Sequence, residues 1–456
     1  MSQSTTPLTR EYSHHASLAA LVAHLAARGI FDEVRQGVHL AQKTVKDSPQ
    51  DKVQDILLAL LAGAQSLVQL NTLLRQDAAL QRAAEQSVAQ QTLDAATTEN
   101  VAELRQVLTR LLHRHSQVAQ HAFRSPWLIL DADLTGLPTG KRAEESKKGY
   151  FSQPKHRRGR QQGRMLASQY GEIVVDALYP GNTLLVQVLP QLIEQAEGVL
   201  SLQPAQRRRT LVRIDGGGGS IASVNCLLSR GYAVVTKDYS FRRTALLAKS
   251  VTQWVSDPAQ PTRQMGWVPE ESRDYVAPVR RLVVRSKSTK DRWQYAVLLF
   301  AHLSDSDLLT LMGASPTTDA ATIMGAYLHF YDQRGGGIES SFGQDKSGLG
   351  ITKRTKKRFQ AQRFLMLLGT LAHNLLMWSR RWLAASSPEV AQRLRHDGIK
   401  RMIRDLAQIS GVLHFDAQGR LYAITLTAAN SLAKLMLLPL RQMLAPSSID
   451  ITLDKT

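Results

Sequence analysis

Apolar residues in the N-terminal part of the chain recur with the spacing of amphipathic helices. Leucine, valine and isoleucine fall three or four positions apart, which places them on one helix face. The clearest runs are residues 18–25, 53–61 and 101–112. Thr97 and Thr98 precede Glu99, as an N-cap precedes an acidic first turn. Residues 16–123 are therefore predicted to be helical, either as a helix-turn-helix module or as a bundle without a ligand.

The pattern changes after Ser125-Pro126, a natural boundary between elements. Short apolar runs replace the helical spacing, and two of them end in acidic residues. Strands are predicted at 127–133, 164–168, 172–178, 210–215 and 232–236, and helices at 184–199 and 221–230. Three strands, a helix, a strand, a helix and a strand indicate a mixed α/β sheet.

The segment 238–305 has a different pattern, with tryptophans and apolar residues between polar turns. It predicts antiparallel strands, and we interpret it as a β-rich insertion in the α/β domain. The chain is expected to become helical again from Thr317, with a long apolar helix over 359–382. Near the end, residues 412–415 and 421–426 flank a polar turn with glycine and predict a β-hairpin.

Charge separates this chain from an ordinary globular protein. Its 456 residues include 57 Lys and Arg against 38 Asp and Glu, a formal net charge of +19. Such a chain usually binds a polyanion, either nucleic acid or an anionic membrane. The N-terminus has no secretory apolar segment, and the most apolar run, 364–378, is short for a bilayer span. The single Cys226 excludes an internal disulfide and indicates a reducing compartment. We expect a soluble, cytoplasmic protein that binds nucleic acid and no membrane.

Three acidic residues stand where their side chains can meet. Asp133 and Asp215 each end a predicted strand, and Glu339 lies at the start of a predicted helix. Acids at the ends of adjacent strands converge in a crevice above the sheet. Clustered carboxylates favour Mg²⁺ or Mn²⁺, and two such ions can support an in-line phosphoryl displacement.

Other acids compete for these positions, because a single Asp at a strand end is more often a turn former or a helix cap. Asp131 shares a strand face with Asp133, so either residue can be the first ligand. Asp238 also ends a strand, and Asp332 and Asp345 lie near Glu339.

The segment around Glu339 is more specific. Tyr331 and Arg334 are one helical turn apart, and Glu339 and Lys346 are nearly two turns apart, so each pair shares a helix face. Lys346 and Arg334 are candidates to hold phosphates, and Tyr331 is a candidate to stack on a base or position water.

By residue type and order, these four positions resemble the Y-(2)-R-(3)-E-(6)-K signature of DDE-type insertion-sequence transposases, which have an RNase H-like catalytic domain. The Glu-to-Lys gap matches the signature, whereas the Arg-to-Glu gap, Gly335-Gly-Gly-Ile338, is one residue longer. Asp133-Leu-Thr135 resembles the D-x-T of the family's first Asp, and Arg213-Ile-Asp215 resembles the strand of its second. The insertion is also similar to a family trait, so the resemblance covers roughly residues 50–440.

The resemblance implies a function and a fold. Asp133, Asp215 and Glu339 would be the catalytic triad and would hold two Mg²⁺ (or Mn²⁺) ions. Water would cleave a phosphodiester at a transposon end, and the freed 3′-hydroxyl would attack target DNA. The protein would act on double-stranded DNA as a homodimer or higher multimer. The expected regions are a helical, DNA-binding 1–125, the first part of the RNase H-like core at 126–237, the β-rich insertion at 238–305, the second part of the core at 306–385, and a C-terminal helix and hairpin region at 386–456.

Basic clusters fit DNA binding, because each cationic contact neutralises a backbone phosphate. The expected DNA-binding residues are Lys353, Arg354, Lys356, Lys357 and Arg358 after the Glu339 helix, and Lys155, Arg157 and Arg158 in a polar loop. Two alternatives stay open: a stand-alone nuclease that uses the same acids, and a non-catalytic or domesticated DNA-binding protein.

Overall fold

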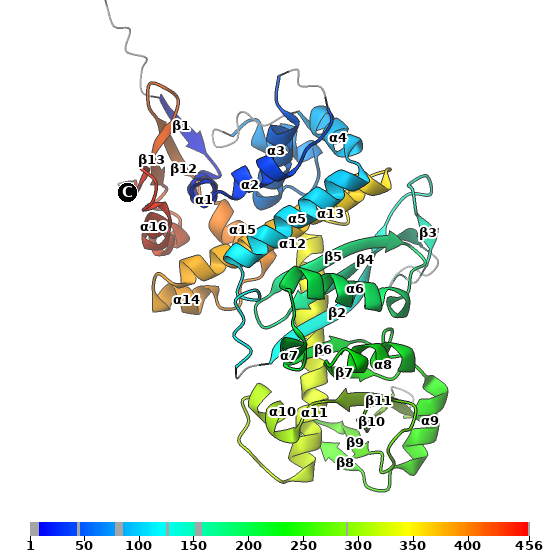
Figure 1. The fold of residues 1–456 in the computed structure, drawn as a ribbon. Coiled ribbons are helices and arrows are strands. Elements are labelled where there is room, and N and C mark those ends of the chain that lie inside the picture. The colour runs from blue at the N-terminus through cyan, green and yellow to red at the C-terminus, as the bar shows by residue number, and fades with distance from the viewer. Residues whose placement is uncertain are drawn as a thin grey trace, which may run out of the picture. The chain divides into compact units, whose positions relative to one another are not determined.

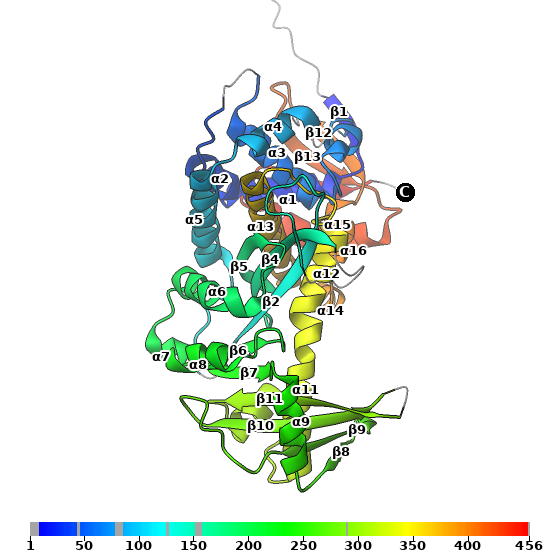
Figure 2. The ribbon, with the colours of Figure 1, turned by 90° about the vertical axis from the view of Figure 1, so that its right-hand side faces the viewer.

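The computed structural model describes residues 9–42, 46–77, 85–124, 127–149, 151, 157–288 and 291–454. The chain forms two compact units, drawn as ribbons in Figures 1 and 2. The first contains Met1–Ser116, Leu137–Ser146 and Phe342–Thr456, and the second contains Gln117–Gly136 and Lys147–Ser341. Within the described residues, no helix is long and apolar enough to cross a membrane.

Helices dominate the N-terminal part of the first unit, as its sequence predicts. They are α1 (Ala16–Ala27), α2 (Ile30–Gly37), α3 (Pro49–Leu61), the π-helical turn η1 (Leu70–Leu74), α4 (Gln86–Ala95) and α5 (Thr98–His115). Thr97 caps α5 because its hydroxyl accepts a hydrogen bond from the backbone N–H of Asn100, and Asn100 Oδ1 accepts one from the backbone N–H of Thr97. The apolar face of α5, including Val101, Leu104 and Leu111, is buried.

The C-terminal part of the first unit shares the same core. The long helix α13 (Phe359–Ala384) is buried along nearly its whole length and contacts α3, α4 and α5 as well as the later helices. Those helices are α14 (Pro388–Leu394), α15 (Ile399–Ala407) and α16 (Ser431–Leu444). A helix that is apolar on all sides is stable only when neighbours surround it, which explains why α13 sits centrally in this unit.

The first unit also contains a four-stranded sheet in the order β1-β12-β13-β14. Its centre is the predicted hairpin, β12 (Gly411–Phe415) and β13 (Leu421–Leu426), which is confirmed. The outer strands are β1 (Thr9–Ser13) and β14 (Asp450–Leu453), and neither was predicted. Their sequences carry little apolar pattern, and they become strands by pairing with the hairpin.

The sheet of the second unit starts from the predicted strands. They are β2 (Leu128–Pro138), β4 (Arg158–Ala167), β5 (Glu172–Pro180), β6 (Thr210–Ile214) and β7 (Ala233–Lys237), with the two-residue β3 (Lys147–Lys148) beside β4. Strands β2, β6 and β7 are parallel, and β4 and β5 form an antiparallel pair. The helices between them are α6 (Leu185–Leu200), α7 (Pro204–Arg207) and α8 (Ile221–Ser229). The prediction of a mixed α/β sheet is confirmed.

The segment after β7 extends this sheet. Strands β8 (Val255–Asp257), β9 (Gln260–Trp267), β10 (Val279–Lys287) and β11 (Trp293–Ala301) are antiparallel, and β11 pairs with β7. The order across the described strands is therefore β3-β4-β2-β6-β7-β11-β10-β9-β8, with β5 paired to β4. One unpredicted helix, α9 (Phe241–Ser250), lies between β7 and β8; its apolar Phe241 and Leu246 are exposed, so it lacks the buried stripe that would have indicated it.

Two helices cover one face of the sheet. Helices α10 (Asp305–Leu311) and α11 (Ala320–Arg334) bury Leu308, Tyr327 and Phe330 against strand residues such as Leu211 and Phe300. In Figure 2, α11 lies on the opposite side of β6 and β7 from α8. Because alternate residues of a strand face the same side, residues 213 and 215 follow Leu211 toward the α11 face.

Candidate active site

Two of the three predicted acids come from neighbouring strands. Asp215 directly follows the last residue of β6, but β2 continues to Pro138, so the prediction that Asp133 ends its strand was wrong. Strands β2 and β6 run parallel in the interior of the sheet, with Ala132 opposite Ile214, so Asp133 and Asp215 are the next residues side by side, at the carboxyl end of β6. The glycines after Asp215 allow the chain to turn there. At Gly219 a side chain would collide with the backbone carbonyl of Lys237, so only glycine fits this turn.

Asp133 is in an unusual electrostatic environment. Burial raises its pKa to about 7; Arg334 opposes this shift, whereas the charges of Asp215 and Glu339 add to it. One oxygen of Asp133 accepts a hydrogen bond from the Leu134 amide at 2.7 Å. The repulsion from two other carboxylates indicates that all three predicted acids share one neighbourhood.

Asp215 has an oxygen that the protein does not satisfy. Its Oδ1 is buried and has no hydrogen-bond partner in the described structure. A buried carboxylate oxygen without a donor is costly, and such atoms often mark a site for an ion or water. Asp215 therefore has a free acceptor next to the part of β2 that carries Asp133.

Glu339 reaches this neighbourhood through a π-helical turn. Helix α11 continues without a break into η2 (Gly335–Glu339) and then α12 (Ser340–Gly348). The sequence placed Glu339 at the start of a helix, and this was wrong: it lies inside a continuous helical stretch. In a π turn, residues five apart are neighbours along the axis, so Arg334 and Glu339 share a face despite the extra residue between them.

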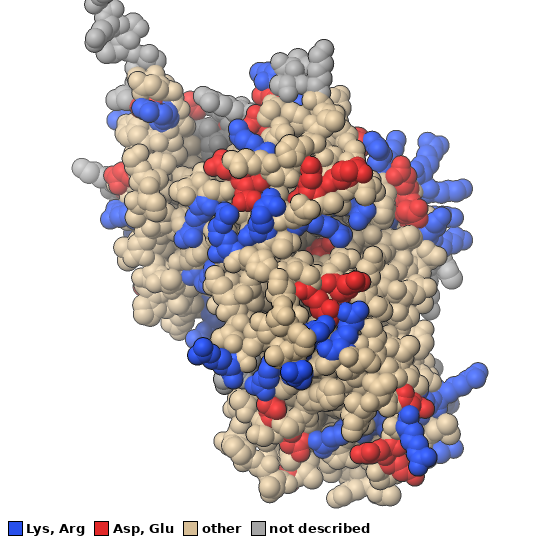
Figure 3. All heavy atoms as spheres, viewed as in Figure 1, with Lys and Arg blue, Asp and Glu red and all other residues tan. Residues whose placement is uncertain are grey.

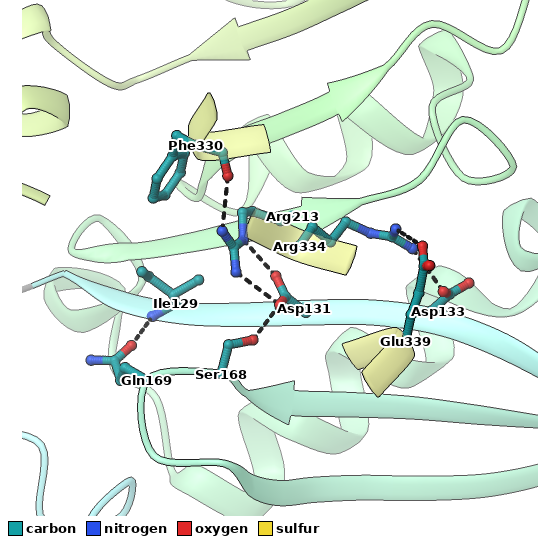
Figure 4. Close-up of polar contacts among 9 residues, drawn as sticks. All are labelled: Ile129, Asp131, Asp133, Ser168, Gln169, Arg213, Phe330, Arg334 and Glu339. Carbon is teal, nitrogen blue, oxygen red and sulfur yellow. Dashed lines mark hydrogen bonds and ion pairs between the residues drawn. The ribbon is translucent and has the colours of Figure 1, made fainter. Parts of the chain in front are cut away.

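Arg334 lies between two of the acids (Figure 4). One guanidinium nitrogen is 2.7 Å from Asp133 Oδ2, and another is 3.0 Å from Glu339 Oε1. The Arg334 side chain is 5% exposed, that of Asp133 is 14% exposed and that of Glu339 is 61% exposed. The guanidinium thus occupies the position between carboxylates where a cation is expected.

The competing acid Asp131 has a different role. It is fully buried and pairs with Arg213 through both oxygens, at 2.6 and 2.9 Å, and Ser168 donates to it as well (Figure 4). Arg213 also donates to the Phe330 carbonyl on α11 at 3.0 Å. This closed network joins β2, β6 and α11. Sequence reasoning missed it, although an arginine in the apolar run of β6 signals a buried acidic partner.

The other competing acids are also engaged. Asp238 pairs with Arg243 at the start of α9, and Asp332 pairs with Arg263 at 2.7 Å. In the first unit, Asp345 pairs with the buried His373 at 2.7 Å. These contacts give each acid a structural role.

The residues predicted to bind DNA fall in several places. Tyr331 on α11 is half-buried; burial raises its pKa to about 12, with Asp215 and Asp133 adding to the shift and Arg334 opposing it. Lys346 lies on α12 in the part of that helix that belongs to the first unit. Arg157 is exposed and Arg158 is half-buried, whereas Lys155 lies outside the described residues.

The basic loop before α13 alternates between exposed and buried side chains. Lys353, Lys357 and Arg358 are exposed, but Arg354 and Lys356 are only 4% and 7% exposed. The basic side chains on the face drawn in Figure 3 form several groups with acidic residues between them. The exposed members of the loop are therefore the ones available to a nucleic-acid phosphate.

The donor set fits a hard divalent cation in kind, although it is not a ready-made site. Within the described residues, no three Asp, Glu, His or Cys side chains are grouped so as to hold a metal ion. However, Asp215 offers an unsatisfied buried oxygen, and Asp133 and Glu339 are held by another cation, Arg334. Carboxylate oxygens of this type suit Mg²⁺ or Mn²⁺.

Comparison with known proteins assigns no family. No family model and no curated protein matches the chain. Among solved structures, the chain is similar to the piggyBac transposase in a cryo-EM synaptic complex with hairpin DNA. The TM-score is 0.48 at 12% sequence identity, and the match covers 88% of this chain and 82% of that chain. At this level the likeness does not assign a fold family or a function.

Proposed function

We propose that this protein is a transposase that cuts and joins DNA ends at Asp133, Asp215 and Glu339. The observation that carries the proposal is the convergence of three acids from distant segments at the carboxyl end of β6. Burial and the charges of Asp215 and Glu339 raise the pKa of Asp133, and Arg334 bridges Asp133 and Glu339. Perturbed carboxylates grouped in this way are typical of catalytic sites.

The fold proposed for this site is RNase H-like. An antiparallel strand pair, β4 and β5, lies beside β2 and is followed by two strands, β6 and β7, each reached through helices. The acids come from β2, from the end of β6 and from the helical stretch after α11. This arrangement supports the resemblance of the sequence motifs to DDE-type transposases.

Asp133, Asp215 and Glu339 would hold the divalent cations, of which two are expected. When bound, such cations activate an attacking hydroxyl and stabilise the leaving oxygen of a phosphodiester. Of the other two acids, Glu339 is exposed enough to meet a large substrate, whereas Asp133 is largely enclosed. The pair Asp131–Arg213 fixes the strand and helix that carry these groups.

Basic side chains would supply the contacts to double-stranded DNA. We assign phosphate contacts to the exposed Lys353, Lys357 and Arg358, and to Arg157 and Lys346. Such contacts would make binding weaken steeply as salt rises. The proposal includes a homodimer or higher multimer on paired DNA ends.

Cleavage of DNA that carries the ends bracketing the reading frame tests this function. With Mg²⁺ or Mn²⁺, wild-type protein should cut these ends and should also join a pre-cut 3′-hydroxyl end to target DNA. Asp133→Ala, Asp215→Ala and Glu339→Ala should each abolish both reactions, whereas the matched control Asp332→Ala should retain them. Cutting without joining would indicate a nuclease, and DNA binding without cutting would indicate a non-catalytic protein.

A further inference from the structure

The second unit contains two arginines that pair with acids near the site, and their environments differ. Arg213 uses Nε and both terminal nitrogens, toward the two oxygens of Asp131 and the Phe330 carbonyl. Arg334 donates through its two terminal nitrogens only, and its Nε is buried without a partner in the described structure. Arg213 is therefore completely satisfied, and Arg334 is not.

The acidic partners of the two arginines also differ, in how far they are exposed to solvent. Asp131 is 0% exposed and receives a further hydrogen bond from Ser168, so its pair with Arg213 is closed on all sides. Glu339, by contrast, is 61% exposed, and its pair with Arg334 is open to solvent and ions. Partly exposed ion pairs are weak and exchange readily, whereas a buried, fully bonded pair is costly to break.

The backbone around Arg334 leaves room for such an exchange. A side chain at Gly336 would meet no atom within 4 Å, and at Gly335 only Glu339 Oε2, at 3.8 Å. Of these three glycines only Gly337 is closely packed, because a Cβ added there would lie 2.9 Å from Asp131 Oδ2. The turn is thus anchored to the Asp131 network at one residue and has free space at the residues next to Arg334.

We propose that Arg334 is an exchangeable internal cation, which holds Asp133 and Glu339 in the metal-free protein and releases them when a divalent cation binds. This inference rests on the proposed function, because it assumes that the acids bind a metal ion. The released guanidinium, which is planar and carries several donors, is then available to a DNA phosphate. Cation binding and DNA binding would therefore strengthen each other.

Arg334 and a divalent cation compete for the same oxygens of Asp133 and Glu339, so removing Arg334 should tighten cation binding. Loss of the exposed pair with Glu339, together with the enclosed pair with Asp133, corresponds to at least about a tenfold increase in affinity. If Arg334 instead positioned the acids for the metal, its removal would weaken binding.

Mn²⁺ binding to the full-length protein, measured from the electron paramagnetic resonance signal of free Mn²⁺, provides the test. Arg334→Gln should bind about tenfold more tightly than wild type. Arg334→Lys keeps the charge but cannot bridge two acids, so its affinity should be intermediate. The matched control is Arg263→Gln, because Arg263 also bridges two acids, Asp257 and Asp332, away from the site.

A duplex DNA end is then added to each protein. In wild type, DNA should tighten Mn²⁺ binding, and in Arg334→Gln this coupling should be lost or strongly reduced. Circular dichroism melting checks that each variant is folded; if Arg334→Gln is not, Arg334→Lys still decides the sign. Equal or weaker Mn²⁺ binding by a folded Arg334 variant would overturn the inference.

The design separates this inference from the proposed function. If wild type bound no Mn²⁺, or if Asp133→Asn and Asp215→Asn did not abolish its Mn²⁺ binding, the cation site itself would be wrong. If those variants abolished binding but the Arg334 variants did not tighten it, only the exchange would be wrong.

Discussion

Deletion of Gly336 should be tolerated, although removing a residue from a helix normally disrupts every contact beyond it. In an α-helix each residue turns the chain by about 100°, so a five-residue step from Arg334 to Glu339 would separate their directions by about 140°. The π turn η2 brings them to one face, 3.0 Å apart. Without Gly336 the step is four residues, and a regular α-helix then separates the two by only about 40°.

The deletion therefore replaces the π turn by an α-helical turn. The side chains before and after the turn keep their orientation relative to one another. We expect the variant to melt close to wild type and to retain most metal-dependent cleavage. Insertion of one alanine after Gly336 makes the step from Arg334 to Glu339 six residues long. In an α-helix the directions of these two side chains would then differ by about 120°, so the insertion should abolish cleavage. The substitution Gly336→Ala should raise the free energy of unfolding by about 0.5–1 kcal/mol, because glycine is a poor helix former and this position has free space.

Gly343 provides a matched control. It is also an exposed glycine at which an added side chain would meet no atom within 4 Å, but it lies in the regular helix α12. Its deletion would rotate Asp345 away from the buried His373 and should lower stability markedly. Melting temperature and end cleavage are measured for both deletions. If loss of Gly336 were as damaging as loss of Gly343, the role assigned to the π turn would be wrong.

Three further outcomes are expected. Asp131→Asn leaves Arg213 buried without its carboxylate and should destabilise the protein by about 3–5 kcal/mol in chemical denaturation, whereas Asp133→Asn should remove cleavage at little cost in stability. Arg354→Met should stabilise the protein by roughly 1–4 kcal/mol, because the Arg354 Nε and Nη2 are buried with no partner in the described structure, and the exposed Lys353→Met should change nothing. The pKa of His115 is lowered to about 4, mainly by burial and further by the charges of Arg28, Arg114 and Arg381. Because the unfolded chain then binds the proton more readily than the folded protein, the stability of the fold should fall as pH drops from about 6.5 toward 4. His115→Gln should show a smaller fall in melting temperature between pH 7.5 and pH 5.

The sequence was sufficient where local pattern decides structure. Strand β6 is an apolar run that ends at a glycine-rich turn after Asp215, and α5 has both a capping residue and an apolar face, whereas β2 continues past the apolar run that predicted it. It was insufficient where a partner decides. Strands β1 and β14 depend on the central hairpin, and helix α9 has no buried stripe.

The same distinction applies within the site. Asp131 and Asp133 stand on one strand face and cannot be separated by spacing, and only their partners show that Asp131 is fully buried against Arg213 while Asp133 pairs with Arg334 beside Glu339. The basic residues 353–358 form one run in the sequence, yet burial alternates along them because their surroundings do. The extra residue before Glu339 looked like a departure from a motif, and the π turn absorbs it.

Replacement of each acid by cysteine tests the central claim most directly, because thiolate prefers softer metal ions than Mg²⁺. Asp133→Cys, Asp215→Cys and Glu339→Cys should each lose end cleavage in Mg²⁺ and recover part of it in Mn²⁺, with Asp332→Cys active in both. Recovery at these positions alone would show that the three side chains bind the catalytic cation. Full cleavage in Mg²⁺ by any one of the three variants would contradict the proposed site.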